Sequence, residues 1–268
     1  MPKSFAQALR LGVSNGELAL LKTSRLFGPR ETVLAELAFE GGAAALGPAL
    51  RRLFEQAAPA GWPLTVVLSD ELVRLWQVTP PRAASQMADL EAAAALRFRA
   101  LFGAPPASWK ISADWNLANP FLAAAVPQTL LALLEQASHE HGLHLVGIVP
   151  QFVAALNEWR KARRQGAWFG LVQGGVLTLA AYDGAALVAV RAAVFPVGAG
   201  RDWLDAHVAR EALRLGLECP EHVQLCGPAP TAWASDASRP GFACALLDGD
   251  TLAGWSALAR LARTGSRA

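Results

Sequence analysis

Two short polar turns carry the residues of this chain that could take part in chemistry. Each turn follows an apolar, strand-like run, at residues 9–13 in the first case and 168–172 in the second. Such a turn can bring bare backbone N–H groups up to a phosphate, because glycine has no Cβ to hold the ligand away. The residues of the two turns, which we take as candidate nucleotide-binding positions, are Ser14, Asn15, Gly16, Gln173, Gly174 and Gly175.

Neither turn carries the charge that phosphoryl transfer requires. The reaction needs Mg²⁺ and an oriented nucleophile, which carboxylates at strand ends supply. Aligning the turns on their glycines places Ser14 and Gln173 where those acids would stand, and the first aspartate of the chain is Asp70. A serine could still bind a metal-held water and a glutamine could orient one. Two interpretations therefore stay open: ordinary hairpin turns, or a nucleotide cleft without catalytic acids.

Two other groups of reactive side chains lack the spacing of a functional site. His139 and His141 would point to different sides of a helix, and His144 lies beyond its expected end, whereas zinc-binding pairs usually sit at i and i+4. Cys219 and Cys226 have neither redox nor zinc-motif spacing. We expect buried free thiols and no metal site.

The composition is that of a folded protein with a substantial core. Of the 268 residues, 53% are hydrophobic and 17% are charged, which excludes a disordered chain or a coiled coil. The formal net charge is +2 and no long basic run alternates with aromatic residues, so nucleic acid is not expected as the main partner. Neither a signal peptide nor a membrane span is recognisable. We expect a cytoplasmic, soluble protein.

The two turns open two copies of one pattern: three strands, an amphipathic helix and a further strand. This βββαβ order follows from the strand alternation and from the helical spacing of apolar residues. The elements expected in the first copy are strands at 9–13, 17–22 and 32–39, a helix at 43–57 and a strand at 64–68. Those of the second are strands at 168–172, 176–182 and 186–195, a helix at 203–217 and a strand at 222–226. Asp202 and Asp205 are expected to cap the second helix and to complement its dipole.

An α+β insertion is expected between the two copies, at about residues 70–148. Its expected elements are strands at 72–78, 109–115, 121–126 and 143–149 and helices at 85–101 and 128–141. A helix from Pro150 to about Arg164 follows, and the basic stretch 160–166 marks the expected boundary. The predicted domains are therefore 1–164, which holds the insertion, and 165–268, which closes with a strand at 242–247 and a helix from Thr251.

This arrangement resembles the PilM-type actin-like proteins of type IV pilus assembly. Their relatives include the cytoplasmic domains of type II secretion GspL proteins and the MshI-type pilus biogenesis proteins. The resemblance covers most of the chain, by layout more than by identity. It rests on residues 11–16, 64–68, 73–80, the helix with Glu91, and residues 121–127, 142–150 and 170–175. The fold class that it implies is α/β, actin-like (ribonuclease-H-like), with duplicated βββαβ domains and an α+β insertion in the first.

The resemblance implies a non-enzymatic cytoplasmic scaffold of a type IV pilus or type II secretion assembly platform. Such a scaffold binds the N-terminal cytoplasmic tail of a bitopic inner-membrane protein and reaches the membrane through it. The alternative is a nucleotide-binding or ATP-hydrolysing enzyme of the actin and sugar-kinase fold class. That enzyme would have to draw its carboxylates from Asp70, Asp114 or Asp183.

The family closes its adenosine pocket with a Gly-Gly turn, and this chain departs from that pattern. Gly227 stands at the matching place, but Pro228 follows it and removes a backbone donor. Together with the uncharged Ser14 and Gln173, this predicts a vestigial cleft at most. No cofactor is expected beyond weak or vestigial ATP binding, and the sequence specifies neither the partner nor the oligomeric state.

Trp109 and Trp115 are candidate partner-binding residues. They bracket an expected strand and, being six positions apart, would lie on the same face of it. Two indole rings on one face could line a groove for a peptide. The alternative is that both rings pack against the helix expected at 128–141.

Overall fold

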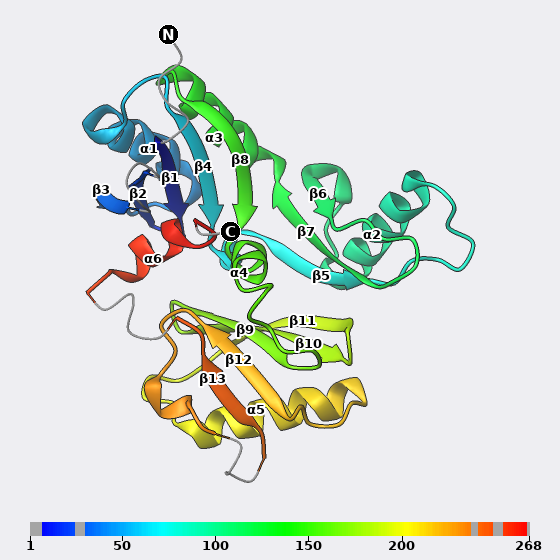
Figure 1. Ribbon diagram of the computed structural model, residues 1–268. Coiled ribbons are helices and arrows are strands. Elements are labelled where there is room, and N and C mark those ends of the chain that lie inside the picture. Colours follow the sequence, from blue (N-terminus) through cyan, green and yellow to red (C-terminus); the bar gives the residue numbers. More distant parts are fainter. Residues whose placement is uncertain (1–6, 25–29, 237–240, 249–253, 267–268) are drawn as a thin grey trace. The chain divides into compact units, whose positions relative to one another are not determined.

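The computed structural model of this protein describes residues 7–24, 30–236, 241–248 and 254–266 (Figure 1). The chain divides into two compact units, each of which is assembled from separate segments. The first unit comprises Met1–Val73, Val126–Glu158 and Ala253–Ala268, and the second Arg74–Ala125 and Trp159–Leu252. The helix start expected at Thr251 lies outside the described residues.

A five-stranded mixed sheet of order β3-β2-β1-β4-β8 forms the centre of the first unit. The central strand β1 is antiparallel to β2 and parallel to β4, and β4 is parallel to β8. The strands are β1 (Gln7–Val13), β2 (Glu17–Ser24), β3 (Arg30–Ala38), β4 (Pro63–Leu68) and β8 (His144–Pro150). The helices of this unit are α1 (Ala43–Ala57), α3 (Gln128–Glu140), α4 (Gln151–Glu158) and α6 (Ala257–Arg263).

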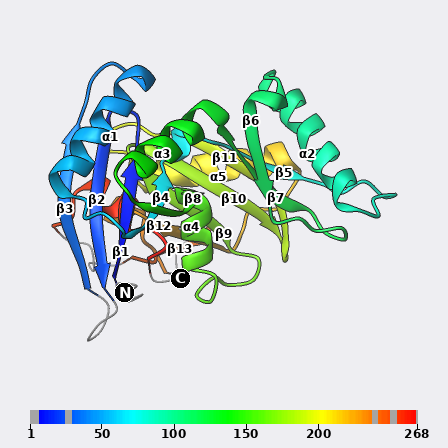
Figure 2. The same cartoon turned by 90° about the horizontal axis from the view of Figure 1, so that it is seen from above.

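The two faces of this sheet are covered by different helices (Figure 2). Strand alternation separates the leucines of β1, such as Leu9 and Leu11, from Gly12 on the opposite face. Side chains of α6 pack on the face of the sheet that holds Gly12, where they contact a cluster with Ala19, Leu21 and Val67 of the strands. Figure 2 shows α1 and α3 on the other side of the sheet. The core of this unit combines leucines and valines of the sheet with apolar side chains of the helices, such as Leu50 and Phe54 of α1 and Phe152 of α4.

The second unit repeats this layout. Its main sheet has the order β11-β10-β9-β12-β13, with β9 antiparallel to β10 and parallel to β12. The strands are β9 (Trp168–Gln173), β10 (Val176–Asp183), β11 (Ala186–Val194), β12 (His222–Cys226) and β13 (Ala243–Leu246). The crossover helix α5 (Arg201–Leu215) packs Leu204, Val208 and Ala212 onto one face. The predicted βββαβ duplication is confirmed.

A small three-stranded sheet of order β5-β7-β6 forms the inserted region. Its strands are β5 (Arg74–Val78), β6 (Trp109–Ala113) and β7 (Phe121–Pro127), and helix α2 (Met87–Phe102) covers it. Leu90, Ala94 and Phe98 of α2 form a cluster with buried residues of β5 and β7. An α+β insertion is present, but it is shorter than the predicted 70–148, because α3 and β8 belong to the first unit, where β8 pairs with β4. Its first strand β5 begins later than expected because residues Asp70–Leu72 form a 3₁₀ turn.

The helix expected from Pro150 to Arg164 ends early, at Glu158. Contacts of the following residues explain the early end. The buried Gln224 amide accepts the Arg164 backbone N–H at 2.8 Å and donates to the Ala162 carbonyl at 3.1 Å. The Arg163 guanidinium donates to the Tyr182 hydroxyl at 2.8 Å. These bonds hold the basic stretch in a turn that no periodicity in the sequence reveals.

The C-terminal helix α6 lies on the sheet of the first unit, whereas the sequence placed it in a domain of residues 165–268. The Arg10 side chain donates to the Ala262 carbonyl at 2.9 Å and also to the carbonyl of Thr264. The Arg263 guanidinium pairs with Glu31 at 2.5 Å. Contacts between residues so distant in sequence leave no local pattern from which they could be predicted.

Candidate functional site

The first turn, Ser14 to Gly16, is closed by bonds within the hairpin. The Ser14 backbone N–H and its hydroxyl both donate to the Glu17 carbonyl, at 3.0 and 3.3 Å. Gly16 adopts a φ of +103°, a conformation that favours glycine. The Ser14 hydroxyl is therefore turned onto its own hairpin.

A backbone N–H of the first turn is hydrogen-bonded to a carboxylate of the chain. The Asn15 N–H donates to Glu71 Oε1 at 2.7 Å. The preceding residue, Asp70, accepts the Phe152 N–H at 3.0 Å in the first turn of α4. Both acids that follow β4 thus bond the backbone, Asp70 at a helix start where a negative charge is favoured. Asp70, one of the acids that an enzyme of this fold would have to recruit, has a structural role.

The second turn, Gln173 to Gly175, presents two glycines in the left-handed region. Their φ angles are +54° and +76°, and a Cβ added to either would meet no atom within 4 Å. The Gly175 carbonyl accepts the Phe195 N–H at 3.0 Å, which joins the turn to the end of β11. The glycines are therefore required by the backbone conformation and not by close packing.

Gly227 lies against the end of the strand that leads into the second turn. A Cβ on Gly227 would lie 2.0 Å from the Val172 carbonyl oxygen, and its φ is +85°. The structure thus places Gly227 beside Val172, the residue before the Gln173 turn. The Gly227 N–H donates to the carboxylate of Asp248, which follows β13. Here too a carboxylate accepts the hydrogen bond of a backbone N–H in a turn.

Sequence reasoning missed Glu71 and Asp248. Each follows a strand of a five-stranded sheet, and each bonds the turn that follows the neighbouring parallel strand: β1 beside β4, and β12 beside β13. A usable signal existed, because the carboxyl ends of adjacent parallel strands meet at one edge of a sheet. An acid placed just beyond such a strand is within reach of the neighbouring turn.

The described residues offer little for metal-dependent chemistry. No group of three or more His, Cys, Asp or Glu side chains in that part of the chain is arranged to hold an ion. Asp183 ends β10, whose antiparallel pairing with β9 puts it at the opposite end of the sheet from Gln173. Asp114 lies just beyond β6 in the small sheet, where its N–H donates to the Leu122 carbonyl at 3.1 Å. Asp183 therefore does not stand in for the missing acid of the second turn.

Trp109 and Trp115 both pack on the cluster formed by α2 and the small sheet, and both are partly buried. The Trp109 ring lies 5.4 Å from that of Phe98, and the Trp115 ring 5.7 Å from that of Phe121. Trp109 therefore packs against α2 and Trp115 against the start of β7, whereas the sequence suggested the helix at 128–141. Trp115 also lies beyond β6, which ends at Ala113, so the two rings do not share one strand.

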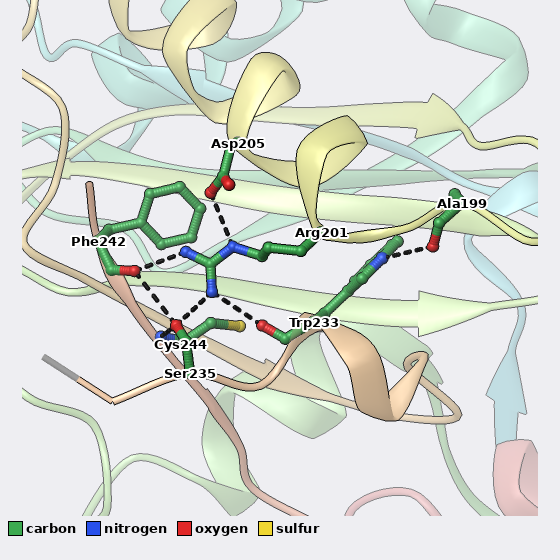
Figure 3. A network of polar contacts seen from close by, with 7 residues as sticks. All are labelled: Ala199, Arg201, Asp205, Trp233, Ser235, Phe242 and Cys244. Atoms are coloured by element: carbon green, nitrogen blue, oxygen red, sulfur yellow. Dashed lines mark hydrogen bonds and ion pairs between the residues drawn. The ribbon is translucent and has the colours of Figure 1, made fainter. Parts of the chain in front are cut away.

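The N-terminal turn of α5 holds a buried cation that is fully used by the fold (Figure 3). The Arg201 guanidinium donates to Asp205 at 2.7 Å, to the Trp233 carbonyl at 3.0 Å, to the Phe242 carbonyl at 2.6 Å and to the Ser235 hydroxyl. Capping by aspartate was expected here, but no side chain caps α5 and Asp205 pairs with Arg201 instead. The network ties α5 to β13.

The three cysteines are free thiols in different environments. Cys226 and Cys244 are buried, whereas Cys219 is exposed, so the expectation of burial is wrong for Cys219. Burial raises the pKa of the Cys244 thiol to about 11, so this thiol stays protonated and unreactive at neutral pH.

The duplicated sheets and their crossover helices define an actin-like, ribonuclease-H-like fold. Comparison with solved structures agrees. The cytoplasmic domain of EpsL, an inner-membrane component of the type II secretion system of Vibrio cholerae, is similar over 98% of this chain and 94% of its own, with a TM-score of 0.61 and 14% identity. The PilM-PilN type IV pilus biogenesis complex matches over 97% and 86%, with a TM-score of 0.57 and 16% identity.

A third similar structure is a protein of unknown function with an actin-like ATPase fold from Bacteroides thetaiotaomicron. It matches over 85% of both chains with a TM-score of 0.57 and 10% identity. At these identities the comparisons show a shared fold. No family model and no curated protein matches the sequence. Among the described helices, none combines the length and apolar character needed to cross a bilayer.

Proposed function

We propose that this protein is a non-enzymatic scaffold in the assembly platform of a type IV pilus or type II secretion system. The observation that carries the proposal is the likeness of fold over nearly the whole chain to the EpsL cytoplasmic domain and to the PilM-PilN complex. In this role the protein binds the N-terminal cytoplasmic tail of a bitopic inner-membrane partner. It works in the cytoplasm and is held at the inner membrane by that partner.

The geometry of the turns supports a role without nucleotide chemistry. A phosphate at the first turn would have to displace Glu71 from the Asn15 N–H, and a phosphate in the second unit would have to displace Asp248 from the Gly227 N–H. At each place it would also meet the negative charge of the displaced carboxylate, and like charges at contact distance are unfavourable. Because Ser14 and Gln173 stand in place of acids, neither residue provides a carboxylate that could hold a metal ion. The protein therefore uses no cofactor.

The partner tail is tested directly with synthetic peptides. The probes are the N-terminal tails of single-span membrane proteins encoded beside this gene, each labelled with a fluorophore. We expect one of them to bind with saturable anisotropy, and a scrambled peptide of the same composition to give no signal. Binding weakened by Trp115→Ala, but not by the exposed change Leu213→Ala, would support the assignment of Trp109 and Trp115 to the partner site.

The competing function, ATP binding or hydrolysis, is tested on the same preparation. Titration with Mg-ATP into the millimolar range is expected to give no binding heat, and phosphate release is expected to stay at the level of buffer. Steady hydrolysis that Ser14→Ala or Gln173→Ala abolishes would contradict the scaffold proposal. Saturable ATP binding without turnover would contradict only the proposal that the protein uses no cofactor, and would leave the scaffold role standing.

A further inference from the structure

Helix α2 exposes a leucine among small and charged side chains, on the side away from the small sheet. Leu90, Ala94 and Phe98 face the small sheet and are buried. On the opposite side, Leu96 is 70% exposed. Ala92 and Ala100, four positions before and after Leu96, and Ala88, one turn further, are short and exposed, and Arg99 stands at i+3.

Charges of opposite sign stand at the two ends of this exposed side. Asp89 lies in the first turn of α2 and Arg99 in the last. Asp89 accepts the N–H groups of Ser85 and Gln86 at 2.8 and 3.1 Å. These bonds lower the pKa of its carboxyl, so the negative charge persists well below neutral pH. The helix dipole accounts for this order of charges, but not for the exposed leucine between them.

We propose that the exposed side of α2 is a self-association surface, on which α2 of a second copy of this chain packs in antiparallel orientation. With the two-fold axis beside position 94, Leu96 of each copy lies over Ala92 of the other, Asp89 faces Arg99, and Ala88 faces Ala100. Every contact has a complementary group on an identical helix, as a two-fold interface requires. A parallel pair would instead place like charges side by side.

The surface fits a weak, reversible dimer. A single pair of four-turn helices is smaller than a standard interface of about 800 Å² per partner. The exposed ion pairs set orientation more than affinity, because water and salt screen them. Most of the binding free energy therefore comes from burying Leu96 against the small side chains, which let the two helices approach closely. This surface lies on the side of α2 away from Phe98, on which Trp109 packs.

Sedimentation velocity of the full chain over a range of concentrations tests the association. We expect a concentration-dependent monomer–dimer equilibrium, a shift to monomer for Leu96→Glu, and at least about tenfold weaker association for Arg99→Glu, since like charges would then face each other. The control Leu213→Glu makes the same change at a position 83% exposed on α5 and should leave the equilibrium unchanged. A wild-type chain that stays monomeric, or variants that dimerise like it, would overturn the proposal.

Disulfide trapping tests the antiparallel register. Cys219 is exposed, so the trapping variants carry Cys219→Ser. One preparation adds Ala92→Cys and a second, carrying a peptide tag, adds Leu96→Cys. Under mild oxidation of the mixture, the antiparallel pair predicts mainly tagged–untagged crosslinks between positions 92 and 96. Crosslinks mainly within each variant, or yields no higher than for an exposed cysteine on α5, would show that the proposed pairing is wrong.

Discussion

Glu71 Oε1 accepts the backbone N–H of Asn15 at 2.7 Å, so an acid of the chain itself bonds the first turn of this actin-like fold. Asp248 bonds the Gly227 N–H in the same way in the second unit. In both places the acid follows a strand parallel to the one before the turn. A carboxylate that accepts the turn's backbone N–H stabilises the turn without a ligand and disfavours the binding of a phosphate there.

Replacing this acid should test what the contact does. Glu71→Gln keeps an oxygen that can accept the Asn15 N–H but removes the charge. Because Glu71 is exposed, we expect the free energy of unfolding to fall by no more than about 1 kcal/mol, as measured by urea denaturation. We also expect no ATP hydrolysis, because Ser14 still provides no metal-binding charge. Turnover gained on this substitution would show that Glu71 is the group that blocks an otherwise complete site.

Gly12 is required by the close approach of α6. A Cβ at this position would lie 2.8 Å from the Ala262 backbone nitrogen. We expect Gly12→Ala to lower the free energy of unfolding by about 1–3 kcal/mol, as other overpacked cores do. It should also speed proteolytic cleavage near the C-terminus as α6 is displaced. Gly147→Ala is the matched control, since it also lies in a strand of this sheet and its Cβ would meet nothing within 4 Å. Equal losses in both variants would contradict the packing of α6 on Gly12.

Arg201 should be among the costliest polar residues to replace (Figure 3). It is 5% exposed, and its loss would strand the buried carbonyls of Trp233 and Phe242 without their donor. We expect Arg201→Met to destabilise the protein by about 3–5 kcal/mol, with little recovery in Arg201→Lys, because an ammonium lacks the forked geometry. Urea denaturation followed by tryptophan fluorescence measures this. The exposed change Arg210→Lys is the control, and a similar loss there would refute the assignment.

His207 makes stability depend on pH. It is 6% exposed and stacks on Trp203 at 5.0 Å, and its Nε2 has no hydrogen-bond partner. Burial lowers the pKa of His207, helped by Arg210 and Arg214 and opposed by Glu211, whose carboxylate also pairs with Arg191 of β11. The fold therefore favours the neutral ring. Its stabilisation is complete above the unfolded pKa of about 6.5 and is lost as the pH falls below that value.

Chemical denaturation at pH 7.5 and 5.5 measures this dependence. We expect His207→Gln to reduce the difference in the free energy of unfolding between the two pH values, by at most about 1.4 kcal/mol, because the lower pH lies about one unit below the unfolded pKa. The exposed His144→Gln variant should keep the wild-type difference. A wild-type difference that persists in His207→Gln would assign the pH dependence to other groups.

Local patterns were sufficient to predict the repeated architecture. Alternation in Leu9–Val13 and helical spacing in Ala43–Ala57 report geometry between near neighbours, and such geometry survives in the folded protein. The glycine turns were recognisable for the same reason, because positive φ angles restrict residue type locally. The absence of acids at Ser14 and Gln173 was equally readable from the sequence.

Only the tertiary structure showed which carboxylates bond the backbone N–H groups of the turns. Glu71 meets Asn15, and Asp248 meets Gly227, only because parallel strands bring their carboxyl ends to one edge of a sheet. The packing of α6 on Gly12 also depends on the tertiary structure, since residues about 250 positions apart share no periodicity. Periodicity describes how a segment folds on itself. Which segments then pack together is decided by the free energy of the whole arrangement, in which each contact depends on many others.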